Sequence, residues 1–142
     1  GGHEGLALSK LYSNFGDVIS GQVVRFVLLD IYNHLHETDR AYFRESREQR
    51  FSATLEQVVA DRDQKLQSFR DSLHPLRMTL RTQPYFGGET PLYADYAIFG
   101  VFQWARCISP FQLLEKDDPI ALWRDRLLQA FNGLAASAPG YD

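Results

Sequence analysis

The chain has 142 residues, of which 44% are hydrophobic and 13% aromatic, and its net charge is −3. Such a chain is expected to fold as one globular domain with its own core, which excludes a disordered tail, a disulfide-stapled miniprotein and a multidomain enzyme. The negative charge argues against non-specific binding to nucleic acid or to an anionic membrane. No run approaches the ~20 apolar residues of a membrane span.

The chain has a single cysteine, Cys107. One cysteine cannot form an internal disulfide, so we expect a reducing, cytoplasmic setting. The sequence begins at Gly1 without a methionine and lacks the basic and apolar segments of a secretory signal. We therefore expect that residue 1 is not the start of the natural gene product.

The first periodic segment predicts a long amphipathic helix from about Leu6 to Ile31, with apolar residues at helical three-and-four spacing. Gly16 and Gly21 lie inside this segment, and each costs roughly 1 kcal/mol relative to alanine. We expect a bend there, or a close approach by another backbone or a ligand.

A short charged helix is predicted over Arg40 to Arg50. Thr54 and Gln57 then have capping-box spacing, and from Leu55 an apolar stripe continues for about 28 residues with only Arg62 interrupting it. Because the stripe stays in phase beyond Pro75, we expect one helix that kinks near 71–74 rather than stopping there.

A different kind of segment follows the Gly87-Gly88 turn. Residues 96–105 contain only Gln103 as a polar side chain that is not aromatic, which predicts a central buried helix near residues 92–108. If Leu92 is the N-cap, Asp95 is the third helical residue, and its carboxylate can accept from the backbone N–H of residue 92. Thr90 as the cap, followed by a proline at the first helical position, is locally the stronger alternative.

A last amphipathic helix is predicted from Pro119 to Ala135, with Asp118 as its N-cap. No segment alternates in the way a β-strand does. The predicted fold class is therefore all-α, a helical bundle in which the other helices pack around the segment 92–108.

Residue types that often carry chemistry are few, and each has a structural explanation. His34 and His36 lack a partner cysteine, so we expect no metal site. Cys107 ends the most apolar segment, where a cysteine usually behaves as a small hydrophobe. The basic stripe of Arg40, Arg44, Arg47 and Arg50 is interleaved with glutamates, which favours a solvated face over a binding site.

Several short motifs resemble the C-terminal helical domain of glutathione S-transferases, and in detail its bacterial β-etherase-like branch. They are the Gly-Gly turn, Tyr93-Ala94-Asp95-Tyr96, Phe99-Gly100, Phe102 to Arg106 and Ser109-Pro110, followed by Asp118-Pro119, Trp123-Arg124 and the segment 138–141. The resemblance covers essentially residues 1–142 as a single domain and is strongest from Phe86 onward.

The resemblance implies that Asp95 is a structural carboxylate of the core helix. The family usually has serine or threonine three residues before it, where this chain has Leu92. The groups that bind and activate glutathione belong to an N-terminal thioredoxin-like domain that these residues do not contain. No catalytic residue is therefore carried over.

In the family, the helical domain contributes the wall of the electrophile pocket and much of the homodimer interface. For this chain the resemblance places the pocket wall at Tyr12 and Phe15, with Phe111 a weaker candidate. Glutathione would be the co-substrate and a hydrophobic aromatic electrophile the substrate of the parent enzyme. The alternative function is a non-catalytic protein-interaction module that uses the Arg40 to Arg50 stripe as its docking face.

Overall fold

The computed structural model describes residues 2–133 and 140–141 of the chain. Over those residues it is entirely helical, which confirms the predicted fold class, and the only β-type pairing there is an isolated bridge between Tyr85 and Gly88. The helices are α1 (His3–His34), α2 (Glu37–Phe51), α3 (Leu55–Val59), α4 (Arg62–Ser72), α5 (His74–Thr82), α6 (Tyr93–Ile108) and α7 (Pro119–Gly133).

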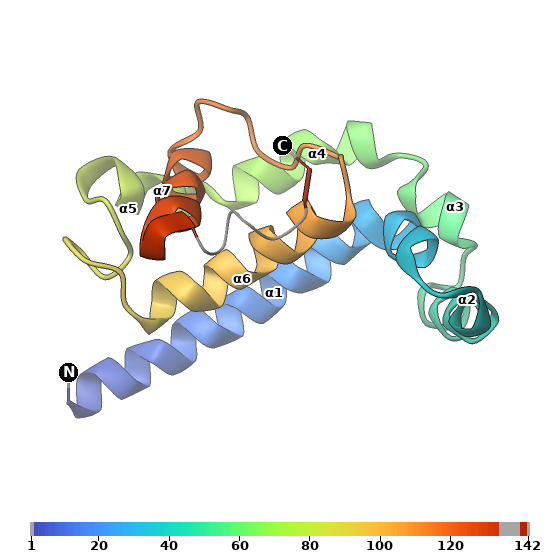
Figure 1. Ribbon diagram of the computed structural model, residues 1–142, viewed down its shortest axis with the longest axis horizontal. Coiled ribbons are helices and arrows are strands. Elements are labelled where there is room, and N and C mark those ends of the chain that lie inside the picture. Colours follow the sequence, from blue (N-terminus) through green and yellow to red (C-terminus); the bar gives the residue numbers. More distant parts are fainter. Residues whose placement is uncertain (1, 134–139, 142) are drawn as a thin grey trace.

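Helices α1 and α6 form the axis of the molecule (Figure 1). A Cβ added at Gly16 would lie 3.5 Å from the carbonyl oxygen of Ala97, so the two helices come close there, as expected for this glycine. A Cβ added at Gly21 would have no neighbouring atom within 4 Å. The core is built on this axis by fully buried side chains from three helices: Val23, Val27, Ile98, Phe102 and Trp123.

The stretch after Thr54 differs from the prediction of one kinked helix. Its start is confirmed, because Thr54 accepts from the Gln57 N–H and Gln57 from the Thr54 N–H, as the capping box requires. The chain then forms three helices, with interruptions at 60–61 and at Leu73. Pro75 lies in the first turn of α5, where its missing N–H has no helical acceptor, so it starts a new helix instead of kinking an old one.

Helix α6 lies at the centre of the fold but is not buried on every side. Ile98 and Phe102 are fully buried, whereas Tyr93 is 61%, Tyr96 40% and Trp104 37% exposed. The prediction of a buried helix is therefore wrong for one face of this segment. These three residues, which we call the α6 aromatic stripe, recur at helical spacing and so lie along one side of the helix.

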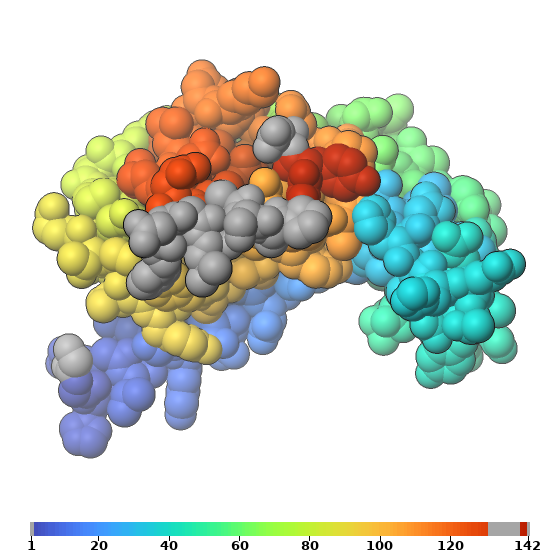
Figure 2. Space-filling view, viewed as in Figure 1, coloured from blue at the N-terminus to red at the C-terminus, as the bar shows by residue number. Residues whose placement is uncertain are grey.

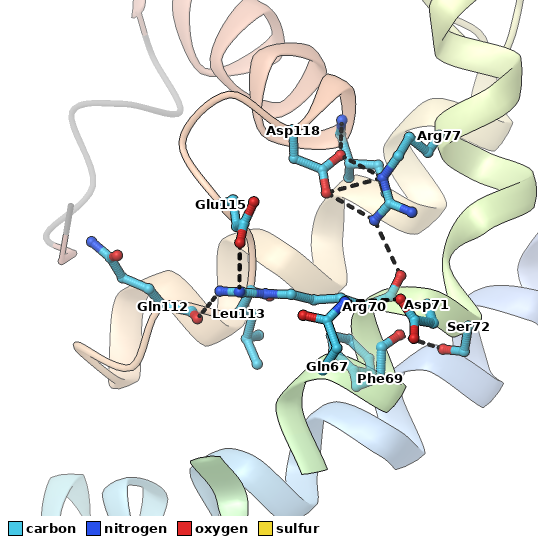
Figure 3. Close-up of polar contacts among 11 residues, drawn as sticks. Gln67, Phe69, Arg70, Asp71, Ser72, Arg77, Gln112, Leu113, Glu115 and Asp118 are labelled. Carbon is cyan, nitrogen blue, oxygen red and sulfur yellow. Dashed lines mark hydrogen bonds and ion pairs between the residues drawn. The ribbon is translucent and has the colours of Figure 1, made fainter. Parts of the chain in front are cut away.

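Helix α7 begins as predicted. Asp118 accepts from the Ile120 N–H at 2.9 Å, and Pro119 is the first helical residue. The same carboxylate receives the Arg77 guanidinium of α5 at 2.9 Å, and Arg70 of α4 donates to the carbonyls of Gln112 and Leu113 in the preceding loop (Figure 3). These bonds connect α5 to the start of α7 and α4 to the loop before it. The predicted helix end at Ala135 lies outside the described residues.

Candidate functional site

The Asp95 carboxylate at the start of α6 is fully buried. One oxygen accepts from the Phe86 N–H at 2.7 Å and from the Trp123 indole at 2.9 Å. The other accepts from the Gly87 N–H at 3.0 Å and the Leu92 N–H at 2.9 Å. Four donors thus satisfy a buried charge and hold α6, α7 and the loop before α6 together.

The start of α6 follows from this arrangement. Leu92 is the N-cap and Asp95 the third helical residue, so Thr90, the alternative cap, lies outside the helix. The reason is that the Asp95 carboxylate binds the N–H of residue 92, which fixes the helix start there. A Cβ at Gly87 would lie 2.5 Å from the Thr90 carbonyl oxygen and 2.6 Å from Leu92 Cγ, so only glycine fits this turn.

Asp95 connects the core to Tyr12 through Phe86. The backbone of Phe86 is bonded to the carboxylate, and its ring lies 5.0 Å from the Trp123 ring and 6.3 Å from the Tyr12 ring, measured between centroids. Tyr12 and Phe15 are partly buried and pack against the main core. One side of each ring is therefore backed by fixed structure.

Three leucines in the same part of α1 are left uncovered. Leu6, Leu8 and Leu11 are 68%, 54% and 62% exposed. In Figure 2 the first turns of α1 project from the lower left of the molecule. Leu8, Tyr12 and Phe15 are spaced four and three residues apart, so they share one side of the helix. We call Leu8, Leu11, Tyr12 and Phe15 the α1 wall.

Phe111 is not part of the α1 wall. Its ring stacks on Phe26, with centroids 5.9 Å apart, and lies under the Arg62 guanidinium at 4.4 Å. Phe26 is fourteen residues after Tyr12, a separation of about 21 Å along a helix. The structure thus keeps Tyr12 and Phe15 together and places Phe111 near the other end of α1.

The arginines of α2 mostly face their own molecule. Arg40 donates to the carbonyls of Asn33 and Leu35 at the end of α1 and lies over the Tyr32 ring. Arg44 also lies over Tyr32 and pairs with Glu56 at 2.9 Å. The hydrogen bond from Arg44 lowers the pKa of Glu56 to about 2. Arg40 and Arg44 therefore fasten α2 to α1 and α3.

A family comparison agrees with this architecture. The model of the glutathione S-transferase C-terminal domain matches residues 7–131. The chain belongs to this family. The described residues correspond to the helical domain of a glutathione S-transferase. Membership of this family implies that glutathione is the co-substrate. This match shows the family and does not assign the chain to the β-etherase-like branch.

Two further properties of the glutathione S-transferase domain, within its described residues, concern membranes and metal ions. None of its helices is long and apolar enough to cross a membrane. No group of three or more histidine, cysteine, aspartate or glutamate side chains in that part of the chain could hold a metal ion. The Cys107 thiol is free and partly exposed.

Proposed function

We propose that this domain supplies the wall of an aromatic electrophile pocket in a glutathione-dependent enzyme. The observation that carries the proposal is the α1 wall, in which Tyr12 and Phe15 are backed by Phe86 and the core while neighbouring leucines stay exposed. Fixed aromatic rings beside open apolar surface are typical of pockets for hydrophobic ligands. Phe111, held between Phe26 and Arg62, is not included.

The reaction we propose is conjugation of glutathione to an aromatic electrophile or glutathione-dependent cleavage of an aryl ether. The motif series around Tyr93 to Arg106 resembles the β-etherase-like branch and supports the second reaction. In either reaction, a thiolate must be generated from glutathione by a neighbouring group that lowers its pKa. In the family this group lies on the thioredoxin-like domain, so we propose that residues 1–142 alone give no turnover.

Two exposed apolar surfaces support the association of this domain with other protein domains. The α6 aromatic stripe and the exposed leucines at the start of α1 leave large apolar side chains in water. Surfaces of this kind mark interaction sites. We propose a homodimer built largely through α1 and the α3–α5 stretch, with the thioredoxin-like domain on the α6 aromatic stripe, in the cytoplasm.

The test uses the full-length gene product that contains this domain, assayed with glutathione and both an aryl ether and a generic aromatic electrophile. Tyr12→Ala removes the ring of the wall and should raise KM for the electrophile about tenfold while leaving KM for glutathione unchanged. Tyr42→Ala is the matched control, because Tyr42 is 77% exposed on α2. Equal effects of the two substitutions would refute the wall, and absence of conjugation and ether cleavage would refute the enzymatic function.

The alternative, a protein-interaction module docking through the α2 arginines, has less support. Arg40 and Arg44 are engaged by α1 and α3, and Arg47 lies over the Phe43 ring of its own helix. A docking face needs cations that a partner can reach, and these three are already in contact with carbonyls, a carboxylate or aromatic rings.

A further inference from the structure

The ring that backs the α1 wall belongs to the loop between α5 and α6 and not to a helix. Tyr85 and Gly88 of this loop exchange both of their backbone hydrogen bonds, at 3.1 and 3.0 Å. The two residues between them, the first of which is Phe86, therefore form the tip of a tight turn. The Phe86 ring is 8% exposed and lies beside the Tyr12 ring. The order of the wall thus depends on how firmly this turn is held.

Side chains from neighbouring elements bind both the N–H groups and the carbonyl groups of the turn. Asp95 of α6 accepts from the Phe86 and Gly87 N–H groups at 2.7 and 3.0 Å. Gln83 follows the last residue of α5, and its Nε2 donates to the carbonyl oxygens of Tyr85 at 2.8 Å and Phe86 at 3.3 Å. The turn is therefore fixed from α6 and from the end of α5.

Arg126 holds the same loop from α7. Its Nη2 donates to the Pro84 carbonyl oxygen at 2.6 Å, and its guanidinium lies 5.6 Å from the centroid of the Tyr85 ring. The residue is partly buried. A hydrogen bond from a charged donor and a cation–π contact are both strengthened by partial removal from water. Arg126 thus fixes the two residues that lead into the turn.

The contacts of Arg126 differ in kind from those of Arg77, which pairs with the Asp118 carboxylate and so joins α5 to the start of α7. Arg126 pairs with no carboxylate in the described part of the chain, and its hydrogen bond and its ring contact both go to the loop. Loss of its guanidinium would leave the Asp118 cap and the bonds of Asp95 in place. It would loosen the segment that precedes Phe86.

We propose that Arg126 is a positioning residue for the aromatic electrophile. It holds the loop that carries Phe86, and the Phe86 ring in turn keeps the Tyr12 ring in its binding orientation. Because the inference concerns the α1 wall, it rests on the proposed function. A loosened loop gives the Tyr12 ring more freedom before binding, and a wall that must be ordered on binding takes its ligand more weakly.

Amide hydrogen exchange on the 142-residue chain measures the loop itself. In Arg126→Gln, the Gly88 N–H should exchange about tenfold faster than in wild type, because the turn has lost a bond to a charged donor. The Ile120 N–H, bonded to Asp118 at 2.9 Å, should keep its wild-type exchange rate. Unchanged exchange at Ile120 shows that the variant is folded and that the loosening is local.

The matched control is Arg124→Gln. Arg124 is a second partly buried arginine of α7, and it lies beside Asp125 and Arg106 instead of the loop. The substitution removes the same chemical group from the same helix. It should leave the exchange of the Gly88 N–H unchanged.

Steady-state kinetics of the full-length gene product measure the wall. With glutathione and 1-chloro-2,4-dinitrobenzene or the aryl ether, Arg126→Gln should raise KM for the aromatic substrate about fivefold and leave kcat and KM for glutathione unchanged. The effect is smaller than that of Tyr12→Ala because the ring is loosened and not removed. Arg126→Lys keeps the charge and a donor for Pro84, and it should recover part of the loss.

A double-mutant cycle separates positioning from general stability. If Arg126 acts through the wall, Arg126→Gln should have no further effect on KM once Tyr12→Ala has removed the ring. Three results would each overturn the proposal: unchanged exchange at Gly88 in Arg126→Gln, equal KM effects of Arg126→Gln and Arg124→Gln, or an undiminished Arg126→Gln effect in the Tyr12→Ala background.

The same measurements distinguish this inference from the proposed function. If Tyr12→Ala leaves KM for the aromatic substrate unchanged, the α1 wall is refuted and the role of Arg126 with it. If Tyr12→Ala raises that KM and Arg126→Gln does not, the wall stands and only the positioning role of Arg126 is refuted.

Discussion

The elements beside the two halves of α1 are held together in different ways. Around its first half, the neighbouring elements are joined by buried carboxylates: Asp95 has four N–H donors, and Asp118, 8% exposed, binds Arg77 and the start of α7. Around its second half, α2 buries no residue and is held by partly exposed arginines over aromatic rings and by the Arg44–Glu56 pair.

This difference is visible in the shape of the molecule. In Figure 2, the segments around α2 and α3 form a separate lobe at the right, whereas α5, α6 and α7 form one dense body. The α2–α3 lobe has a small core of its own, centred on Leu28, Leu55 and Val59. Buried charges with complete hydrogen bonding are costly to disturb, whereas exposed pairs contribute little. The two regions should therefore respond very differently to the loss of one carboxylate.

The largest effect is expected for Asp95→Ala. It leaves four donors without their acceptor, two of them in the turn that holds Phe86 behind Tyr12. We expect a loss of about 3–5 kcal/mol in the free energy of unfolding, measured in urea. Glu89→Ala, an exposed acidic residue in the same loop, is the control. A loss below about 1 kcal/mol would contradict a central role for Asp95.

An intermediate effect is expected for Asp118→Ala. This change removes the N-cap of α7 and leaves the Arg77 guanidinium, 15% exposed, without its carboxylate. The free energy of unfolding should fall by about 2–3 kcal/mol. The neighbouring Asp117→Ala is a matched control, because Asp117 is exposed. Equal stabilities of the two variants would show that the α5–α7 connection is dispensable.

The smallest effect is expected for Glu56→Gln in the α2–α3 lobe. The pKa of Glu56 is lowered from 4.5 to about 2 by Arg44, so its ionised form is favoured in the folded state. The stabilisation it contributes is complete above pH 4.5 and is lost as the pH falls toward 2. The stability difference between wild type and Glu56→Gln should therefore be small and should shrink over this pH range.

Urea unfolding at several pH values measures this difference directly, because the other carboxylates are common to both proteins. Glu45→Gln on the exposed side of α2 is the control and should show no such pH dependence. A difference that stays constant from pH 6 to pH 2 would mean that the Arg44–Glu56 pair does not hold the lobe.

Local signals in the sequence predicted local structure well. The Thr54–Gln57 capping box and the Asp118–Pro119 helix start depend on residues within three positions of one another, and both are confirmed. The interruptions at 60–61 and at Leu73 were missed because the apolar stripe stays in phase across them. Periodicity reports which face is buried and does not report whether the backbone is continuous.

The candidate site was predictable only in part, for a related reason. The sequence indicates that the Asp95 carboxylate can bind the N–H of residue 92, but its other donors come from the preceding turn and from Trp123 on α7, which only the fold brings near. A tryptophan in an amphipathic helix is an ordinary core residue. Its buried N–H needs an acceptor, and this is the signal that could have paired Trp123 with Asp95.

The exposed beginning of α1 has a consequence for how the domain meets its ligands. Leu6, Leu8 and Leu11 give the first turns of this helix little burial, and short helical segments without packing are marginal in water. Their order then depends on what covers them. Association of a partner and formation of the aromatic wall become thermodynamically linked, so that each stabilises the other by the same free energy. The domain would form its pocket most completely only after assembly.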